Sequence, residues 1–322
     1  MKLIKLVLIP IIFALLLRIS FGATIFNDFL SVMTWTFFLL VPAGIGALFI
    51  YFSPIEKVKS IAYRILAPWI PIISVIALTI VIGLEGWACW IMISPLFLIF
   101  ASIGGLIAGH FKNKKNENLN ISILVLLPFL IGPIENAIPR NAKTYTTYTS
   151  IEINSDAQTI WNNVTSVKEI KSNEDNSKLI SWLGFPKPIK AELDTLAVGG
   201  YRKAIFQKGL IFNETVTKYE NLKLMEFQIK ANTYEIPSTT LDEHILIGGE
   251  YFDMLNGTYK LKKISTNKYN LILYSNFSMK TTFNSYASIW GNWIMKDIQN
   301  NILNVIKRRS EKIINDNNNP NN

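Results

Sequence analysis

The sequence predicts an α-helical transmembrane bundle followed by an α+β domain, in which a curved antiparallel sheet wraps a long C-terminal helix. Half of the 322 residues are apolar, more than one water-soluble domain normally contains. Residues 1–139 hold nine of the 32 Lys and Arg and five of the 23 Asp and Glu, so charge density rises sharply after Pro139. We therefore expect a membrane domain over 1–139, a second domain over 140–314 and a disordered tail over 315–322.

Five apolar stretches predict the membrane helices. A helix needs about 20 mostly apolar residues to cross the hydrocarbon core, because lipid cannot satisfy exposed backbone groups. The stretches that meet this condition are 3–21, 29–52, 65–83, 87–111 and 119–138.

Basic residues predict the orientation of these helices. Lys2 and Lys5 precede the first stretch, Lys and Arg follow the second within 57–64, and three Lys follow the fourth within 112–115. Positive charge marks the cytoplasmic side. The pattern predicts a cytoplasmic (inner) membrane protein with its N-terminus inside and its C-terminal domain outside. The first stretch also has the features of a cleavable signal peptide, which leads to the same placement of the C-terminal domain.

The second domain begins with a strand and a short helix. Residues 145–153 are rich in Thr, Tyr and Ile with a period of two, which is typical of a strand. Ser155 and Gln158 have the spacing of a capping box. One helix face follows, formed by Ala157, Ile160, Trp161 and Val164.

Three strands over 201–206, 210–219 and 222–231 form a predicted meander. Pairing across its two turns sets Arg202 opposite Glu214, and Glu214 opposite Phe227. The face that carries this ion pair is otherwise apolar, with Ala204, Phe206, Phe212, Val216, Met225, Phe227 and Ile229.

The rest of the domain is expected to hold strands near 244–252, 258–264 and 269–279, with Asn256–Gly257 as a turn. A final helix is predicted from an apolar stripe of Tyr286, Ile289, Trp290, Trp293, Ile298, Ile302, Val305 and Ile306.

This order of elements resembles the helix-grip superfamily that includes START lipid-transfer domains and bacterial polyketide cyclase/dehydrase-like proteins, often called SRPBCC. The resemblance covers roughly residues 145–312. It is carried by Ile151-x-Ile153 with Ala157-x-x-Ile160-Trp161, by the hairpin from Gly200-x-Arg202 to Glu214, by Gly257-x-Tyr259-x-Leu261 and by the closing helix with Trp290. It implies a deep apolar cavity between the sheet and the final helix.

The resemblance places candidate ligand-binding residues on the walls of that cavity. Arg202 and Glu214 would orient a polar group of the ligand, or they form a buried ion pair that fixes strand register. Aromatic side chains would line the wall or form plain core. His244 is a candidate acid or base, or a hydrogen-bonded histidine. The full set is Arg202, Phe206, Phe212, Glu214, Phe227, Tyr234, His244, Phe252, Tyr259 and Trp290.

Several function classes lack their sequence signatures. The chain has no Gly-rich phosphate loop, no His/Cys cluster with metal-ligand spacing and no nucleophile elbow, so we expect no metal, no cofactor and no identifiable catalytic residue. Its positive charge is dispersed, which argues against nucleic acid and favours contact with membrane lipids.

The leading hypothesis is therefore a membrane-tethered domain that binds a lipid-like or other apolar small molecule. An enzyme of the cyclase, dehydratase or hydrolase type that uses Glu214 or His244 is the alternative. A membrane sensor acting through an unknown protein partner is the second alternative. Glu135, near the end of the fifth stretch, is either a functional ionisable group or a helix-terminating one.

Overall fold

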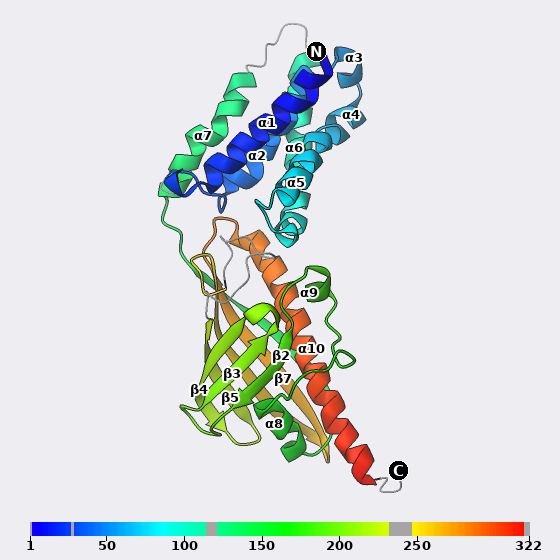
Figure 1. Cartoon of the computed structure of the whole chain (residues 1–322), viewed down its shortest axis with the longest axis vertical. Coiled ribbons are helices and arrows are strands. Elements are labelled where there is room, and N and C mark those ends of the chain that lie inside the picture. Colours follow the sequence, from blue (N-terminus) through cyan, green and yellow to red (C-terminus); the bar gives the residue numbers. More distant parts are fainter. Residues whose placement is uncertain (1, 27–28, 114–120, 232–246, 319–322) are drawn as a thin grey trace. The chain divides into compact units, whose positions relative to one another are not determined.

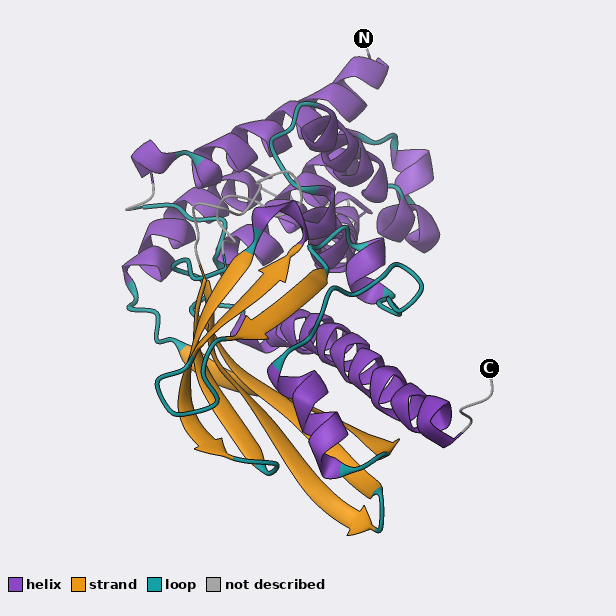
Figure 2. Ribbon diagram, turned by 60° about the horizontal axis from the view of Figure 1, so that its bottom comes forward, coloured by secondary structure: helices purple, strands orange, loops and turns teal. Residues whose placement is uncertain are grey.

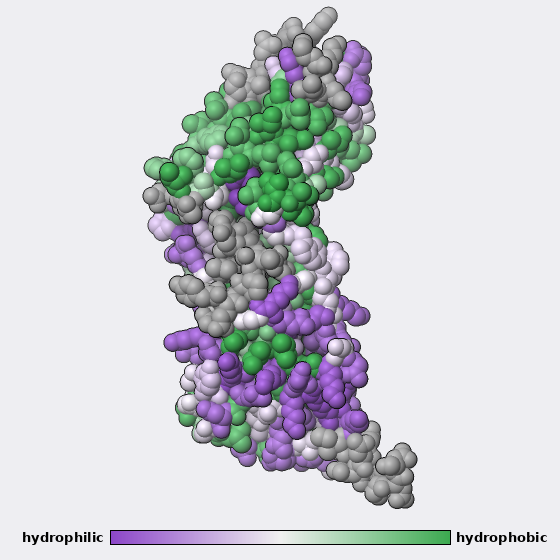
Figure 3. Space-filling view, in the orientation of Figure 1, coloured by the Kyte–Doolittle hydropathy of each residue, from purple (hydrophilic) through white to green (hydrophobic). Residues whose placement is uncertain are grey.

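The computed structural model describes residues 2–26, 29–113, 121–231 and 247–318 (Figure 1). It divides into two compact units. Unit 1 comprises Met1–Asn141 with Thr281–Phe283, and unit 2 comprises Ala142–Lys280 and Asn284–Asn322. Figure 3 shows hydrophobic residues over the helices of unit 1 and many hydrophilic residues over unit 2.

The described part of unit 1 consists of helices joined by turns and short loops. The helices are α1 (Lys2–Gly22), the 3₁₀ turn η1 (Thr24–Phe26), the π-helical turn η2 (Thr36–Leu40), α2 (Val41–Phe52), α3 (Ile55–Val58), α4 (Ile61–Leu66), α5 (Trp69–Val81), α6 (Trp87–Asn113) and α7 (Ile121–Ala137).

Three of these segments are long and apolar enough to cross a membrane by length and composition: Lys5–Gly22, Ile61–Val81 and Trp87–Asn113. They correspond to the first, third and fourth predicted stretches. The second and fifth stretches form shorter apolar helices, Thr36–Phe52 and Val125–Ala137. The second is shorter than predicted because residues 29–34, which precede it, are not helical and contain turns and a bend.

Helices α2 and α6 pack with their backbones in close approach. A Cβ atom added to Gly46 would lie 2.0 Å from the carbonyl oxygen of Ala101, and one added to Gly104 would lie 1.9 Å from that of Ala43. Each helix therefore presents a glycine to the backbone of the other. Small residues at such a crossing allow the close contact on which helix association in membranes depends.

Polar side chains from other helices satisfy the ends of the helix that spans Thr36–Phe52. At its start, the Glu135 carboxylate of α7 accepts the backbone N–H groups of Trp35 (2.8 Å) and Thr36 (2.7 Å). At its end, Lys112 Nζ donates to the carbonyls of Tyr51 and Ser53 (both 2.5 Å). These backbone groups at helix ends have no partner within their own helix, so Glu135 caps the start of another helix, a role that the sequence did not predict.

A buried ion pair joins α1 to the turn between α5 and α6. Arg18 Nε donates to Glu85 Oε1 at 2.5 Å, and both side chains are less than a tenth exposed. The structure shows Arg18 turned toward the helices of unit 1.

Unit 2 is a seven-stranded antiparallel sheet curled around one long helix (Figure 2). The strands are β1 (Lys143–Asn154), β2 (Pro188–Leu193), β3 (Tyr201–Phe206), β4 (Ile211–Glu220), β5 (Leu224–Ala231), β6 (Phe252–Ser265) and β7 (Lys268–Met279), in the order β1-β7-β6-β5-β4-β3-β2. Helices α8 (Ala157–Thr165) and α9 (Leu179–Trp182) lie between β1 and β2, η3 (Gln207–Gly209) links β3 to β4, and α10 (Asn284–Asn318) closes the unit. Helix α10 extends four residues beyond the predicted end of the domain at residue 314.

The predicted start of α8 is wrong by one residue. Asp156 is the N-cap and accepts the Thr159 N–H at 2.9 Å, whereas buried Ser155 donates its hydroxyl to the Ser310 carbonyl of α10. The predicted inner face of α8 is confirmed, because Ile160, Trp161 and Val164 are buried.

The register of β3 and β4 is confirmed, and that of β4 and β5 is wrong by two residues. Arg202 pairs with Glu214, as predicted, but Glu214 pairs with Ile229 rather than Phe227. A bulge between Val216 and Lys218, with a longer turn in which Leu222 has φ 61°, accounts for the shift. Since the shift is two residues, the same side chains still share one face.

Asn256–Gly257 does not form a turn. Both residues lie inside β6, which pairs with β7 on either side of a bulge between Met254 and Asn256. Gly257 pairs with Phe227 of β5, and a Cβ atom added there would meet the Phe227 ring at 2.7 Å. No larger residue fits at this position, because the Phe227 ring occupies the space that a side chain would need. The strand predicted over 244–252 is wrong in its described part: residues 247–251 form an isolated bridge, a turn and bends, and Phe252 begins β6. Its start lies outside the described residues.

The buried face of α10 differs from the predicted stripe in its first half. Ile289 and Trp293 are 45% and 52% exposed. The helix instead turns Gly291, Met295 and Gln299 inward. Gly291 lies against Phe277 of β7, where a Cβ atom would come within 3.0 Å of the ring. Close approach to the sheet, rather than the size of the apolar side chains, therefore selects the inner face.

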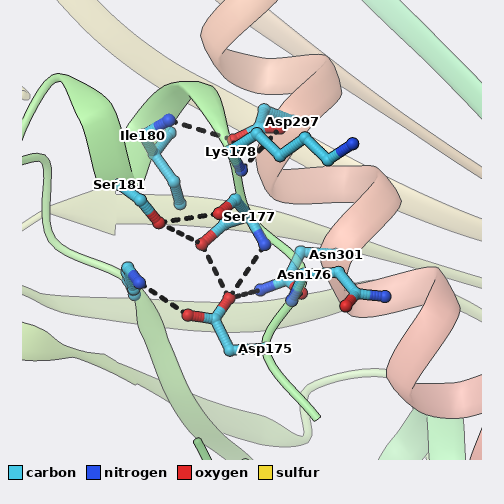
Figure 4. A network of polar contacts seen from close by, with 9 residues as sticks. Asp175, Asn176, Ser177, Lys178, Ile180, Ser181, Asp297 and Asn301 are labelled. Atoms are coloured by element: carbon cyan, nitrogen blue, oxygen red, sulfur yellow. Dashed lines mark hydrogen bonds and ion pairs between the residues drawn. The ribbon is translucent and has the colours of Figure 1, made fainter. Parts of the chain in front are cut away.

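A polar network fixes the segment before α9 to α10 (Figure 4). Asp175 accepts from Asn301 of α10 (2.9 Å) and from Lys187 (2.6 Å). One turn earlier on α10, Asp297 accepts the N–H groups of Lys178 and Ile180 at the start of α9. Arg309 continues this attachment toward the end of α10 by donating to both oxygens of Glu174 (2.8 and 2.7 Å).

Glu174→Gln is expected to remove an acid-dependent part of this attachment. Hydrogen bonding to Arg309 lowers the pKa of Glu174 from 4.5 to about 2. A lowered pKa gives stability that is present above about pH 4.5 and lost as the pH falls toward 2. Hydrogen exchange of residues 168–176, corrected for intrinsic rates, should show about 1 kcal/mol of this loss in the native chain and not in the variant. Equal acid dependence in both proteins would contradict the assignment.

Candidate functional site

The site is built on the concave face of β3, β4, β5 and β6. Arg202 of β3 and Glu214 of β4 are cross-strand neighbours, and Arg202 Nη1 donates to Glu214 Oε2. Each side chain is only 4% exposed. An ion pair that is withdrawn from water is costly unless its partners are well placed, so its presence on an apolar wall requires explanation.

Two aromatic rings flank the guanidinium. Arg202 Cζ lies 5.2 Å from the ring centroid of Phe227 and 5.8 Å from that of Tyr259, within the range of cation–π attraction. The two ring centroids are 6.1 Å apart. Phe227 of β5 and Tyr259 of β6 thus both interact with the Arg202 guanidinium of β3.

Burial changes the titration of the site. It raises the pKa of the Glu214 carboxyl above its ordinary value, and the Arg202 charge opposes this shift only in part. Burial also raises the pKa of the Tyr259 phenol, again against the opposing effect of Arg202.

The remaining predicted residues are distributed along the same core. Phe206 and Phe212 are buried and in edge contact, with ring centroids 4.9 Å apart. Phe252 begins β6, half-buried, with its ring 5.7 Å from that of Phe277. Trp290 of α10 is half-buried and contacts Trp293 rather than the Arg202 group. Tyr234 and His244 lie outside the described residues.

Sequence reasoning missed a second buried polar cluster, on β1, β7 and α10. Gln299 of α10 accepts from the Thr149 hydroxyl (3.0 Å) and donates to Ser275 Oγ (3.0 Å). Thr147 donates to Asn292 Oδ1 at 2.7 Å. The signal was available: Thr147 and Thr149 alternate with exposed residues in β1, which places them on its inner face.

Gly257→Ala is expected to disturb the Arg202 group through Phe227. The new methyl group would displace the Phe227 ring, and overpacking of this kind costs about 1–3 kcal/mol. The unfolding midpoint of the full chain should fall, whereas Lys262→Ala, at an exposed position of the same strand, should change it little. A Gly257→Ala protein of unchanged stability would show that β5 and β6 adapt without cost.

Unit 2 is a helix-grip domain. A curled antiparallel sheet, two short helices after its first strand and a long C-terminal helix that the sheet wraps define that fold, which the SRPBCC and START-like proteins share. Among the described residues of unit 2, the charged side chains that are buried are those of the Arg202–Glu214 pair.

Comparison with known proteins gives structural similarity only. No family model matches the chain, and no curated protein matches it. Solved structures that match about half of the chain include a START superfamily protein from Mycobacterium smegmatis, 8% identical over 52% of this chain and 98% of that one, with a TM-score of 0.34. The Zhui aromatase/cyclase from Streptomyces sp. R1128 is 10% identical over 53% and 96%, with a TM-score of 0.34. Truncated norcoclaurine synthase from Thalictrum flavum is 14% identical over 52% and 95%, with a TM-score of 0.31.

Proposed function

We propose that the chain is a membrane-tethered binding protein whose helix-grip domain takes up a lipid-like or other apolar small molecule between the sheet and α10. The observation that carries the proposal is the buried Arg202–Glu214 pair within a wall of apolar side chains. Ligand pockets combine such a wall with a few polar groups that fix orientation. Apolar contact supplies about 25 cal/mol per Å² removed from water.

Tethering is supported by the apolar helices of unit 1. Lys5–Gly22, Ile61–Val81 and Trp87–Asn113 each have the length and mean hydropathy of a membrane span. We expect the helix-grip domain outside the cytoplasmic membrane, from the distribution of Lys and Arg. The ion pair of Arg18 with Glu85 favours retention of α1, since cleavage after Gly22 would take away the Arg18 partner of a buried carboxylate.

The first test is to identify what the protein carries. The full chain is purified in lipid nanodiscs, and organic extracts are compared by mass spectrometry with those of Phe227→Trp, whose larger ring fills the concave face. The matched control is Tyr148→Trp, at an exposed position of β1. We expect one apolar compound per chain in the native and control proteins that is lost in Phe227→Trp. Identical extracts from all three proteins would contradict the proposal.

One alternative is an enzyme of the cyclase, dehydratase or hydrolase type in which Glu214 or His244 donates or accepts a proton; the burial of Glu214 on the concave face, which raises its pKa, favours it. Once the bound compound is known, Glu214→Gln separates the two functions. An enzyme would bind the compound and lose turnover, whereas a binding protein would show no conversion in either form.

A further inference from the structure

We propose that the ligand is a neutral molecule with a hydrogen-bond acceptor oxygen, such as a ketone, aldehyde or ester, and that this oxygen binds Nε of Arg202. The inference rests on the proposed function, because it specifies the polar group that the same concave face would recognise.

The first argument is an unused donor. A guanidinium carries five N–H groups in one plane. Nη1 of Arg202 donates to Glu214, whereas the buried Nε has no hydrogen-bond partner among the residues that the structure describes. A donor kept from both water and an acceptor is unfavourable. An acceptor atom on the ligand would remove that penalty and gain a charge-assisted hydrogen bond.

The second argument is that the other interior polar cluster is already satisfied. The amide oxygen of Gln299 accepts from Thr149, and its nitrogen donates to Ser275 Oγ. Its hydrogen bonds hold α10 against β1 and β7. Arg202 is therefore the better-placed donor for a ligand within the described part of unit 2.

The third argument is charge balance. Among the described residues of unit 2, the charged side chains in the buried set are Arg202 and Glu214, and their charges are opposite. A carboxylate or phosphate would bring a second negative charge into apolar surroundings, where an uncompensated charge is strongly disfavoured. A neutral carbonyl satisfies Nε without adding charge.

The test uses three probes that share one ring system: 2-acetylnaphthalene, with an acceptor; 2-ethylnaphthalene, without one; and 2-naphthoate, an anion. Binding to the full chain in nanodiscs is measured by equilibrium dialysis, with protein-free nanodiscs to subtract partition into lipid. A hydrogen bond from a charged donor predicts that the acetyl compound binds about tenfold or more tightly than the ethyl compound.

Variants locate the preference. Arg202→Met/Glu214→Leu removes the donor and its counterion together, and it should bind the acetyl and ethyl compounds equally. Lys203→Met, on the exposed face of the same strand, should keep the preference. A carbon-13 carbonyl label gives a readout that does not depend on a variant, because hydrogen bonding moves the infrared carbonyl band of the bound probe to lower wavenumber than in a hydrocarbon solvent.

The outcomes separate the two proposals. Equal binding of the acetyl and ethyl compounds, or an unshifted carbonyl band, overturns this inference and leaves the binding function in place. Tightest binding of 2-naphthoate overturns it in favour of an anion site. Binding of none of the probes above the protein-free level overturns the proposed function as well.

Discussion

Arg202→Met is expected to lower the free energy of unfolding of the helix-grip domain by about 3–5 kcal/mol, the usual cost of removing one partner of a buried ion pair. The loss arises because the Glu214 carboxyl is left among apolar side chains without its counterion. Glu214→Leu should be similarly destabilising, since it leaves the Arg202 guanidinium buried without its counterion. Arg202→Met/Glu214→Leu should recover most of the loss, because neither charge is then buried.

Hydrogen exchange of amides in β3 and β4, measured on the full chain, reports this free energy for the domain alone. Lys203→Met is the matched control on the opposite face and should stay within about 0.5 kcal/mol of the native value. If the double variant were as unstable as the single ones, the cost would come from packing and not from charge.

Gly104→Val should have the second large effect, in unit 1. The new side chain would meet the Ala43 backbone, which cannot move without separating α2 from α6. Overpacking costs about 1–3 kcal/mol and more where backbone must shift, so we expect about 3 kcal/mol or more. The melting temperature of the chain in detergent micelles measures the effect.

The control for Gly104→Val is Ile103→Val, one residue earlier on α6, where the side chain is 39% exposed. It should leave the melting temperature nearly unchanged. If the Gly104→Val protein had the same melting temperature as the Ile103→Val control, the backbones of α2 and α6 would not be in contact. Gly104 could have been recognised from sequence, because Gly104 and Ala108 of α6, like Ala43 and Ala47 of α2, have the four-residue spacing of small residues at helix crossings.

Alternating patterns in the sequence predicted which side chains of the sheet face inward. Arg202, Phe212 and Val216 are buried, as predicted. The error of two residues in the β4–β5 register does not change this, because side chains alternate between the two faces of a sheet and a shift of two residues leaves each on the same face. What the pattern could not supply was the bulge after Val216, which depends on backbone conformation rather than on side-chain type.

The errors at Gly257 and Trp293 share a cause. A glycine after asparagine is the strongest local signal for a turn, but here the tertiary contact with the Phe227 ring decides the residue. Large apolar residues on a helix normally mark its buried face, yet α10 approaches the sheet through Gly291 and leaves Trp293 half exposed. Predictions from local sequence patterns therefore fail where two elements lie so close together that only glycine fits between them.

The Arg18–Glu85 pair also constrains the order of biogenesis. Synthesis reaches α1 long before it reaches position 85, so α1 emerges with a charge whose partner does not yet exist. A buried charge without its partner is strongly disfavoured. The final packing of α1 would therefore wait until α5 and Glu85 have been made, so the first helix of unit 1 to be synthesised would be among the last to reach its final packing.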